Sequence, residues 1–262
     1  MSNEFATKGV KLAKLPSDYG STGFKMFKGS ILKNVEIAYE TWGELSINHD
    51  NAILLFTGLS PSSHAASSEN NKSAGWWEYM IGPNKPIDTN KYFVICVNSL
   101  GSCFGSTSPA SINKATGESY GLTFPELSIE DIAKSGHSVL QTLGIDHAHT
   151  VMGPSMGGMT ALAYALLFPN SLSNLIVISA AARALPFTIS IRSLQRELIR
   201  SDPLWNNGVY KKDSAPLNGM KLARKLGLMS YRAANEWRER FNRARLPKSE
   251  DKKMFDIEFE VE

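Results

Sequence analysis

Short runs of apolar residues recur along the middle of the chain, each bounded by Gly, Asn or Ser. They lie at residues 52–56, 92–97, 149–152 and 175–178. Such runs, rich in β-branched residues, are typical of strands buried on both faces, as in a parallel sheet covered by helices. An earlier segment, 35–39, alternates apolar and polar residues and predicts a half-exposed strand.

Two segments between these strands carry apolar residues at helical spacing. Residues 128–143 predict a helix with Ser128 as its N-cap and Asp131 completing only a loose capping box. Residues 156–168, rich in Ala and Leu, predict a second helix that ends before Pro169. The alternation of strands and helices along the chain indicates an α/β sheet.

The pattern changes beyond residue 182. Residues 189–245 hold many Arg, Lys and Leu at helical spacing and no convincing strand. We therefore expect an α/β core over residues 1–182 and part of a helical lid over residues 183–262. The last segment, 255–262, alternates apolar and acidic residues, which suits either a strand or the start of a helix.

Composition narrows the class of protein. A length of 262 residues suits one large domain or a core with a smaller appendage, and a net charge of +3 is too small to indicate a nucleic-acid partner. Cys96 and Cys103 match neither a redox pair nor a zinc site, and no cluster has metal-ligand spacing, so we expect no metal. Without a signal peptide or a run of about 18 apolar residues, the prediction is a cytoplasmic protein that does not bind membranes.

The strongest chemical signal is the sequence Gly-Pro-Ser-Met-Gly-Gly-Met at residues 153–159. It matches G-x-S-x-G and stands between a predicted strand and a predicted helix, the context in which this motif presents a nucleophilic serine. Ser155 is then the nucleophile, and the backbone N–H of Met156 stabilises an oxyanion. The alternative is a Gly-rich turn with an incidental serine.

A second oxyanion donor is expected in the loop after an earlier strand. Residues 57–61, Thr-Gly-Leu-Ser-Pro, follow the apolar run 52–56 and make the backbone N–H of Leu59 the candidate. An ordinary Gly/Pro turn explains the same residues equally well.

The base that such a serine needs is missing from the expected place. In this arrangement the chain order is Ser, acid, His, yet every histidine precedes Ser155: His49, His64, His137, His147 and His149. The chain is thus predicted to be an α/β-hydrolase-type core without its C-terminal strands, triad acid and base. His64 lies near the predicted oxyanion loop, where a solvated histidine is the simpler expectation.

Several stretches together resemble one known family, the homoserine O-acetyltransferases. They are residues 75–77, 81–83, 86–89, 92–98, 101–103, 105–107, 109–113, 155–159 and 201–203. The resemblance implies an α/β-hydrolase fold with a helical lid, and transfer of an acyl group from acyl-CoA to an amino-acid hydroxyl through an acyl-Ser155 intermediate. It implies acyl-CoA as a co-substrate, no resident cofactor, and oxyanion N–H groups from Leu59 and Met156.

Two arginines take roles from the same resemblance. Arg224 falls where the family places an arginine that binds the substrate, and a guanidinium holds a carboxylate bidentately. Arg192 stands where the acetyltransferases tend to have asparagine, and an added cation favours a dicarboxylic acyl group such as succinyl. Each arginine is alternatively a solvated residue of the lid.

Departures from the acetyltransferase pattern favour the serine or homoserine O-succinyltransferase branch. They are the loop 58–67, Arg192, and Pro154 in the expected sharp turn at residues 153–157 that carries Ser155, which we call the elbow. We therefore expect transfer of succinyl from succinyl-CoA, ahead of acetyl from acetyl-CoA, to L-serine or, second, L-homoserine, as in cysteine or methionine biosynthesis.

Three rival functions stay open: a homoserine O-acetyltransferase, a serine esterase or thioesterase, and an inactive truncated family member. Members of the family usually run beyond this length, with the triad acid and histidine in the additional part. The family also leads us to expect a homodimer formed through the lid helices.

Overall fold

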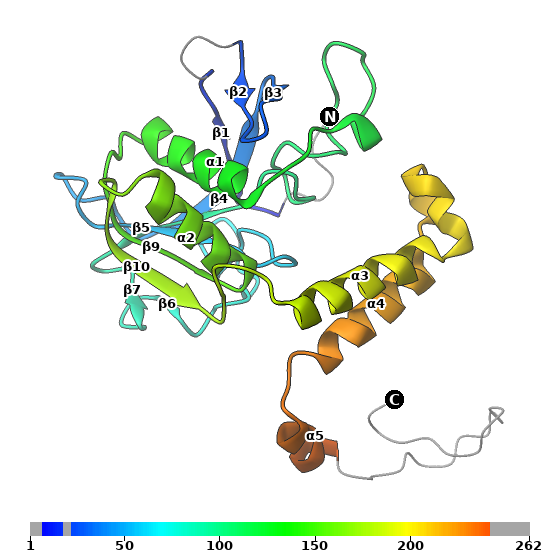
Figure 1. Cartoon of the computed structure of the whole chain (residues 1–262). Helices are drawn as coiled ribbons and strands as arrows, with labels where there is room; N and C mark the ends of the chain where they lie inside the picture. The colour runs from blue at the N-terminus through cyan, green and yellow to red at the C-terminus, as the bar shows by residue number, and fades with distance from the viewer. Residues whose placement is uncertain (1–6, 18–21, 242–262) are drawn as a thin grey trace. The chain divides into compact units, whose positions relative to one another are not determined.

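The computed structural model describes residues 7–17 and 22–241. The chain divides into two compact units, Met1–Arg183 and Ala184–Glu262, which Figure 1 shows in blue to green and in yellow to orange. The first unit contains every strand of the described residues, and the described part of the second is helical. The roles of core and lid stay predictions.

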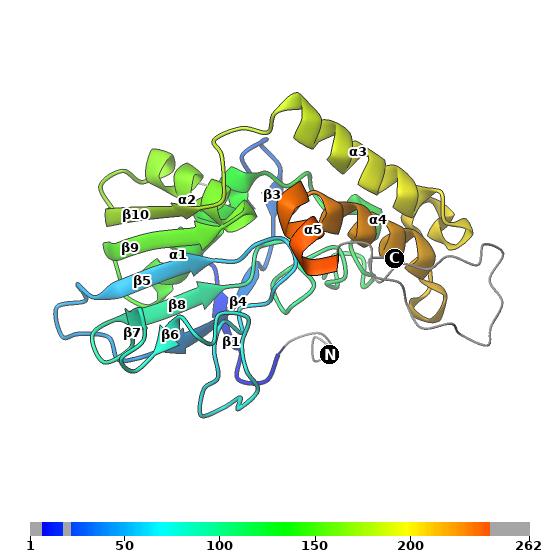
Figure 2. The same cartoon turned by 90° about the horizontal axis from the view of Figure 1, so that it is seen from below.

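A six-stranded sheet forms the centre of the first unit (Figure 2). Its spatial order is β1 (Lys11–Lys14), β4 (Glu36–Trp42), β8 (Phe93–Val97), β5 (Ala52–Phe56), β9 (Ala148–Pro154) and β10 (Leu172–Ile178). The last four strands run parallel, whereas β4 is antiparallel to both β1 and β8. The expected parallel sheet is therefore a mixed one, because the N-terminal strands join it by antiparallel pairing.

Two small sheets flank the large one. The first pairs β2 (Phe24–Lys25) antiparallel with β3 (Ile31–Leu32), and the second pairs β6 (Ile81–Gly82) parallel with β7 (Ile87–Asp88). A short 3-10 helix, η1 (Gly121–Thr123), precedes the first long helix.

Helices α1 (Ile129–Thr142) and α2 (Met156–Leu167) pack against each other and against the sheet. The N-terminus of α1 carries a complete capping box: Asp131 N–H donates to Ser128 Oγ (3.2 Å), and Ser128 N–H donates to Asp131 Oδ2 (2.9 Å). The expectation of a loose capping box was wrong, because the shorter aspartate still reaches back across the turn. Its other oxygen, Asp131 Oδ1, accepts the N–H of Phe27 at 2.6 Å.

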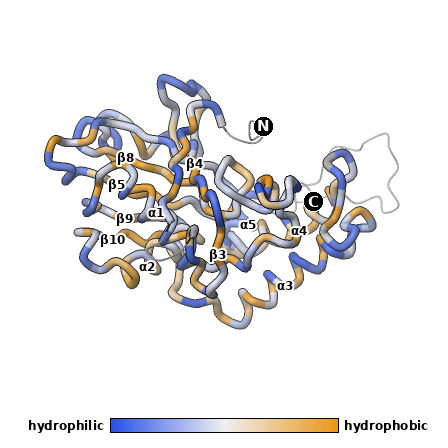
Figure 3. The backbone as a smooth tube through the Cα atoms, turned by 90° about the horizontal axis from the view of Figure 1, so that it is seen from above, coloured by the Kyte–Doolittle hydropathy of each residue, from blue (hydrophilic) through white to orange (hydrophobic). Residues whose placement is uncertain are grey.

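The central strands are buried on both faces, as predicted. Leu54 and Phe56 of β5 enter the apolar cluster shared with α1 and α2, whereas Ile53 and Leu55 enter a second cluster that includes Trp76 and Trp77. This alternation follows from the two-residue period of a strand. Hydrophobic residues concentrate along β5 and β8 in Figure 3.

Two strands differ from the expected burial. The segment 35–39 was predicted to be half exposed, but β4 is almost wholly buried, including Glu40 at 3% exposure. The opposite holds for β10, which lies at the edge of the sheet with Ile176 44% exposed. Burial on both faces requires a neighbour on each side, which sequence patterning does not report.

The second unit consists of helices. Its elements are α3 (Pro186–Arg200), η2 (Pro203–Gly208), η3 (Lys212–Ser214), α4 (Leu217–Met229) and α5 (Ala234–Phe241). Helices α3 and α4 pack together, and the buried Asp202 carboxylate accepts the N–H groups of Leu204 (3.0 Å) and Gly219 (2.8 Å). The segment 255–262, for which we expected a strand or a helix start, lies outside the described residues.

Candidate active site

Ser155 occupies the sharp turn between β9, which ends at Pro154, and α2, which begins at Met156. Its side chain is exposed, and its backbone has φ 55° and ψ −121°. A non-glycine residue held there stores about 1–3 kcal/mol of strain, and such residues cluster at functional sites. The turn is fixed on both sides, since Ser155 N–H donates to Ile178 O (2.9 Å) and Gly158 N–H donates to Ser155 O (3.0 Å).

The glycines around Ser155 are required by close backbone approach. A Cβ atom on Gly153 would lie 2.4 Å from the carbonyl carbon of Gly157, and one on Gly157 would lie 2.3 Å from Phe56 O. A Cβ on Gly158 would lie 2.7 Å from the Cβ of Ala180. The close approach of neighbouring atoms is therefore a steric reason for glycine at all three positions.

The two predicted oxyanion donors lie at the same edge of the sheet as Ser155. Met156 is the first residue of α2, so its N–H has no acceptor within the helix and lies at the positive end of the helix dipole. Leu59, in the loop after β5, is 71% exposed, and its N–H donates to no acceptor among the described residues. That loop passes beside the elbow, since a Cβ on Gly58 would lie 3.8 Å from Pro154 O.

His64 is not the solvated loop histidine that the sequence suggested. It is 8% exposed, its Nδ1 lies 2.9 Å from Glu40 Oε2, and its Nε2 lies 2.8 Å from Ser73 O. Burial lowers the pKa of His64, but the hydrogen bonds to Glu40 and Ser73 and the charges of Glu40 and Glu78 together outweigh it and raise that pKa. Both ring nitrogens are occupied, so His64 is not free to serve Ser155 as a base.

The other four histidines also have partners of their own. His49 Nδ1 bonds Gly144 O at 2.7 Å, and His137 stacks on Phe168 with ring centroids 3.8 Å apart. His147 and His149 lie at the start of β9, whereas Ser155 follows its end. Across residues 7–17 and 22–241, which include all five histidines, none is hydrogen-bonded to Ser155.

Arg192 and Arg224 belong to the second unit, on the neighbouring helices α3 and α4. Arg192 is half-buried and donates to Gln195 Oε1 at 2.7 Å, while Gln195 Nε2 donates to Ala223 O at 2.7 Å. Arg224, which follows Ala223, is exposed. Gln195 thus links the two arginine-bearing helices, and sequence reasoning missed it although it lies one helical turn from Arg192.

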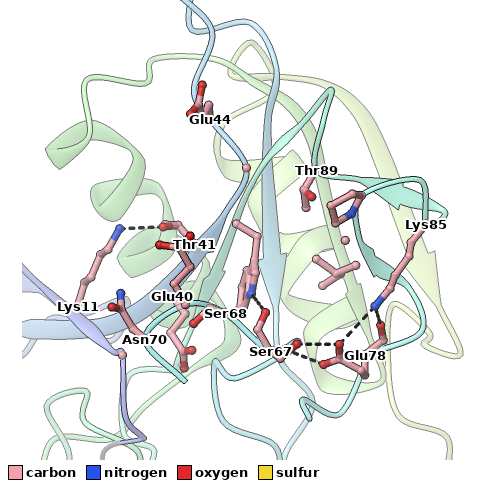
Figure 4. A pocket seen from close by; sticks show the side chains of 17 residues that line it. Lys11, Glu40, Thr41, Glu44, Ser67, Ser68, Asn70, Glu78, Lys85 and Thr89 are labelled. Atoms are coloured by element: carbon pink, nitrogen blue, oxygen red, sulfur yellow. Dashed lines mark hydrogen bonds and ion pairs between the residues drawn. The ribbon is translucent and has the colours of Figure 1, made fainter. Parts of the chain in front are cut away.

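The first unit also holds a pocket of about 560 Å³ that sequence reasoning did not find (Figure 4). Glu78 on its wall accepts hydrogen bonds from Gly75 N–H and from Ser67 N–H and Oγ–H, which with Lys85 lower the pKa of Glu78 to about 2. Lys11 Nζ, at the other side, donates to Thr41 Oγ1 at 2.8 Å. Glu78, Lys85 and Lys11 are thus all engaged with protein partners.

Two further features are absent from the described residues. No group of three or more His, Cys, Asp or Glu side chains there is arranged to hold a metal ion. In that same part of the chain, no helix is both long enough and apolar enough to cross a membrane.

The chain is similar to known proteins in both sequence and fold. The family model described as alpha/beta hydrolase fold matches residues 51–262. A serine O-succinyltransferase from Litchfieldella anticariensis is 58% identical over 239 residues, which cover 91% of this chain and 65% of that relative. Another, from Stenotrophomonas maltophilia, is 53% identical over 260 residues, or 99% of this chain and 69% of the relative.

A solved structure has a similar fold. The homoserine O-acetyltransferase from Bacillus anthracis superposes with a TM-score of 0.80 at 31% identity, covering 92% of this chain and 65% of that one. The chain therefore spans about two thirds of the length of the proteins that it matches, from 65% to 69% in these comparisons.

Proposed function

Because this chain belongs to the α/β-hydrolase-fold family, and within it to the group of the serine O-succinyltransferases, we propose that it moves a succinyl group from succinyl-CoA to the hydroxyl of L-serine. L-Homoserine is the second acceptor and acetyl-CoA the second donor. The observation that carries the proposal is Ser155, exposed and strained at φ 55° in the turn between β9 and α2. No resident cofactor takes part in the proposed reaction.

The reaction has two steps, each of which exchanges one acyl bond for another. Ser155 Oγ attacks the thioester carbonyl carbon, the C–S bond breaks, and CoA leaves as the thiol with the proton that Ser155 loses. The hydroxyl of the amino acid then attacks the new ester, the bond to Ser155 Oγ breaks, and the hydroxyl proton returns to Ser155. In both steps the N–H groups of Met156 and Leu59 face the oxygen that becomes negative.

The two arginines supply charge selection in this proposal. Arg224 pairs with the carboxylate of the amino acid, and Arg192 pairs with the distal carboxylate that succinyl has and acetyl lacks. The support for Arg192 is its hydrogen bond to Gln195, which restrains a long side chain on α3. Substituting Arg192→Asn should lower the succinyl-to-acetyl ratio of adducts on Ser155 by about tenfold, since one charged hydrogen bond is worth roughly 1.5–3 kcal/mol.

Intact-protein mass spectrometry tests the first step directly. The chain is incubated with succinyl-CoA or acetyl-CoA, with Ser155→Ala as the matched control. We expect an adduct of succinyl mass that forms faster than one of acetyl mass and is absent from Ser155→Ala. No adduct from either donor, in a chain shown to be folded, would refute the proposal for this chain.

The second step distinguishes transferase from esterase. Adding L-serine or L-homoserine to the acylated chain should discharge Ser155 and give the O-acyl amino acid. Equal loss of the adduct with and without amino acid would instead identify a serine esterase or thioesterase. No histidine in the described residues is bonded to Ser155, so proton transfer can slow either step. The rates of acylation and of discharge are therefore measured separately.

The assembly and the cellular location belong to the proposal as well. We propose a homodimer formed through the helices of the second unit, and a cytoplasmic enzyme. Light scattering coupled to gel filtration measures the first, and a mass that stays monomeric at every concentration would contradict it. Fractionation of the source cells measures the second.

A further inference from the structure

The loop that carries Leu59 is clamped at its far end by a buried pair of charged side chains. Glu40 on β4 is 3% exposed and His64 is 8% exposed, and the oxygen and nitrogen that join them, Oε2 and Nδ1, lie 2.9 Å apart. His64 Nε2 faces Ser73 O at 2.8 Å. A carbonyl oxygen only accepts, and so does a carboxylate, so with Glu40 ionised both ring nitrogens donate and we take the ring to be an imidazolium.

The carboxylate of Glu40 also holds the residue before His64. Glu40 Oε1 accepts the hydroxyl of Ser63 at 3.1 Å, and Ser63 N–H donates to Asn98 Oδ1 at 2.6 Å. Asn98 follows β8 directly, and its Nδ2 donates to Ser63 Oγ at 3.0 Å. The loop is therefore bound to two strands, β4 and β8, through side chains that are all buried.

The residues just before Ser63 and just after His64 are also held by hydrogen bonds. Trp76 Nε1 donates to Ser62 O at 2.9 Å, and Trp77 N–H donates to Ala65 O at 2.8 Å. At the other end the loop begins at Phe56, the last residue of β5. The Leu59 N–H therefore lies in a short segment, residues 58–61, between Phe56 of β5 and the hydrogen-bonded Ser62, and its position depends on how these two ends are held.

Other groups that face the pair leave its charge balance unchanged. Thr7 Oγ1 donates to Glu40 Oε1 at 2.9 Å. Asn71 Nδ2 lies 3.4 Å from His64 Nδ1 but is itself only a donor, so it forms no hydrogen bond there when Nδ1 donates to Glu40. Cys96, opposite Glu40 on β8, is fully buried, and its burial and the charge of Glu40 raise the pKa of its thiol, so it stays neutral. Glu78 carries a charge of its own but is paired with Lys85 at 3.3 Å.

We propose that the Glu40–His64 ion pair is a positioning device for the reaction, which holds the loop of residues 57–66 so that the Leu59 N–H faces the oxyanion formed at Ser155. The inference rests on the proposed function. A pair of apolar residues would fill the same space with equal or better stability, but it would leave Ser73 O and the Ser63 hydroxyl without their present partners. The ion pair is thus suited to fixing one loop conformation.

Glu40→Gln tests this device because it keeps the shape of the side chain and removes its charge. Ser63→Ala is a milder second variant, and His137→Gln is the matched control, a partly buried histidine bonded to Tyr164 instead of the loop. With succinyl-CoA, Glu40→Gln should acylate Ser155 about tenfold more slowly, since loss of a whole oxyanion donor costs about 10²–10³. Ser63→Ala should show a smaller decrease, and His137→Gln should unfold at a lower temperature yet acylate at the unchanged rate.

Failure of the unmodified chain to form an adduct would count against the proposed function alone. Two NMR measurements test the positioning role in that case as well. Ring ¹⁵N shifts should show both nitrogens of His64 protonated in the unmodified chain, and a neutral ring would overturn the ion pair. The ¹⁵N order parameters of Leu59 and Ser60 should fall from about 0.85 to below about 0.6 in Glu40→Gln. A folded Glu40→Gln with unchanged order parameters, or with an unchanged acylation rate where acylation occurs, would overturn the positioning role.

Discussion

Strands β5 and β10 are both apolar and both pair in parallel with β9, yet only one of them is buried. All five residues of β5 are buried, whereas the seven residues of β10 are exposed or half-exposed. The difference comes from neighbours: β5 lies between β8 and β9, while β10 forms the edge of the sheet. Apolar pattern alone therefore predicts a strand without predicting how much burial stabilises it.

The edge position also leaves β10 able to pair with another strand. Its outer N–H and C=O groups have no partner strand in the described residues, and its sequence, Leu-Ser-Asn-Leu-Ile-Val-Ile, contains no charge or proline that would discourage pairing. The strand is thus available to a further strand, from whatever source, in a way that β5 is not.

The largest expected effect comes from truncating one apolar side chain in each strand. Leu54→Ala in β5 should lower the free energy of unfolding by about 2–5 kcal/mol, because Leu54 is 0% exposed and leaves a cavity. Ile176→Ala in β10 should lower it by less than about 1 kcal/mol, because that side chain is 44% exposed. Denaturant unfolding of the two variants measures the difference, and equal losses would break the comparison.

A second test addresses the point where β5 meets the elbow. Gly157→Ala should destabilise the fold by about 1–3 kcal/mol, because the new Cβ would lie 2.3 Å from Phe56 O and force the backbones apart. Gly58→Ala is the control in the adjacent loop, where the nearest atom to a Cβ is 3.7 Å away. If both variants unfold at the same temperature, close packing at the elbow is not the reason for its glycine.

A smaller effect on stability, but a clear one on association, is expected at the edge. Ile176→Lys places a charge on β10 and should reduce concentration-dependent self-association without measurable loss of the folded state. Sedimentation velocity over a range of concentrations gives the answer, with Ser173→Lys on the same strand as a position-matched comparison. An unchanged sedimentation coefficient in both would show that the edge does not pair.

The smallest effect is expected at Glu78, which follows Trp76 and Trp77 of the apolar cluster on the second face of β5. Hydrogen bonds from Gly75 and Ser67, aided by Lys85, lower the pKa of Glu78 from 4.5 to about 2, so its contribution to stability is present above pH 4.5 and is lost as the pH falls from 4.5 toward 2. Glu78→Gln should flatten this acid dependence, modestly because the side chain is 35% exposed. Thermal melts at intervals between pH 5 and 2, relative to pH 7, would detect it.

The sequence predicted the central strands and the first two helices because each has one dominant period. Helix α2 begins at Met156 as expected, and α1 begins directly after its predicted cap, Ser128. The turn at Ser155 was predictable because its glycines and its place between a strand and a helix are local features. The chemical roles of Ser155, Leu59, Met156, Arg192 and Arg224 stay predictions.

Features that depend on contacts far apart in sequence were not predictable. β1 and β2 lie in a region without a clear period and form by pairing with β4 and β3. The partner of His64, Glu40, is 24 residues away and lies just beyond the segment 35–39 that was predicted to be a half-exposed strand. Gln195 likewise bonds Ala223, 28 positions along the chain. Such pairings follow from tertiary packing, which overrides local preference.

The backbone of Ser155 has a consequence for how this chain tolerates change. At φ 55° and ψ −121° glycine, which has no Cβ, is less strained than serine. Stability alone would therefore favour glycine at position 155, and random variants screened only for folding should accumulate changes there. Under the proposed function, the chemical role of Ser155 and the stability of the fold therefore favour different residues at this position.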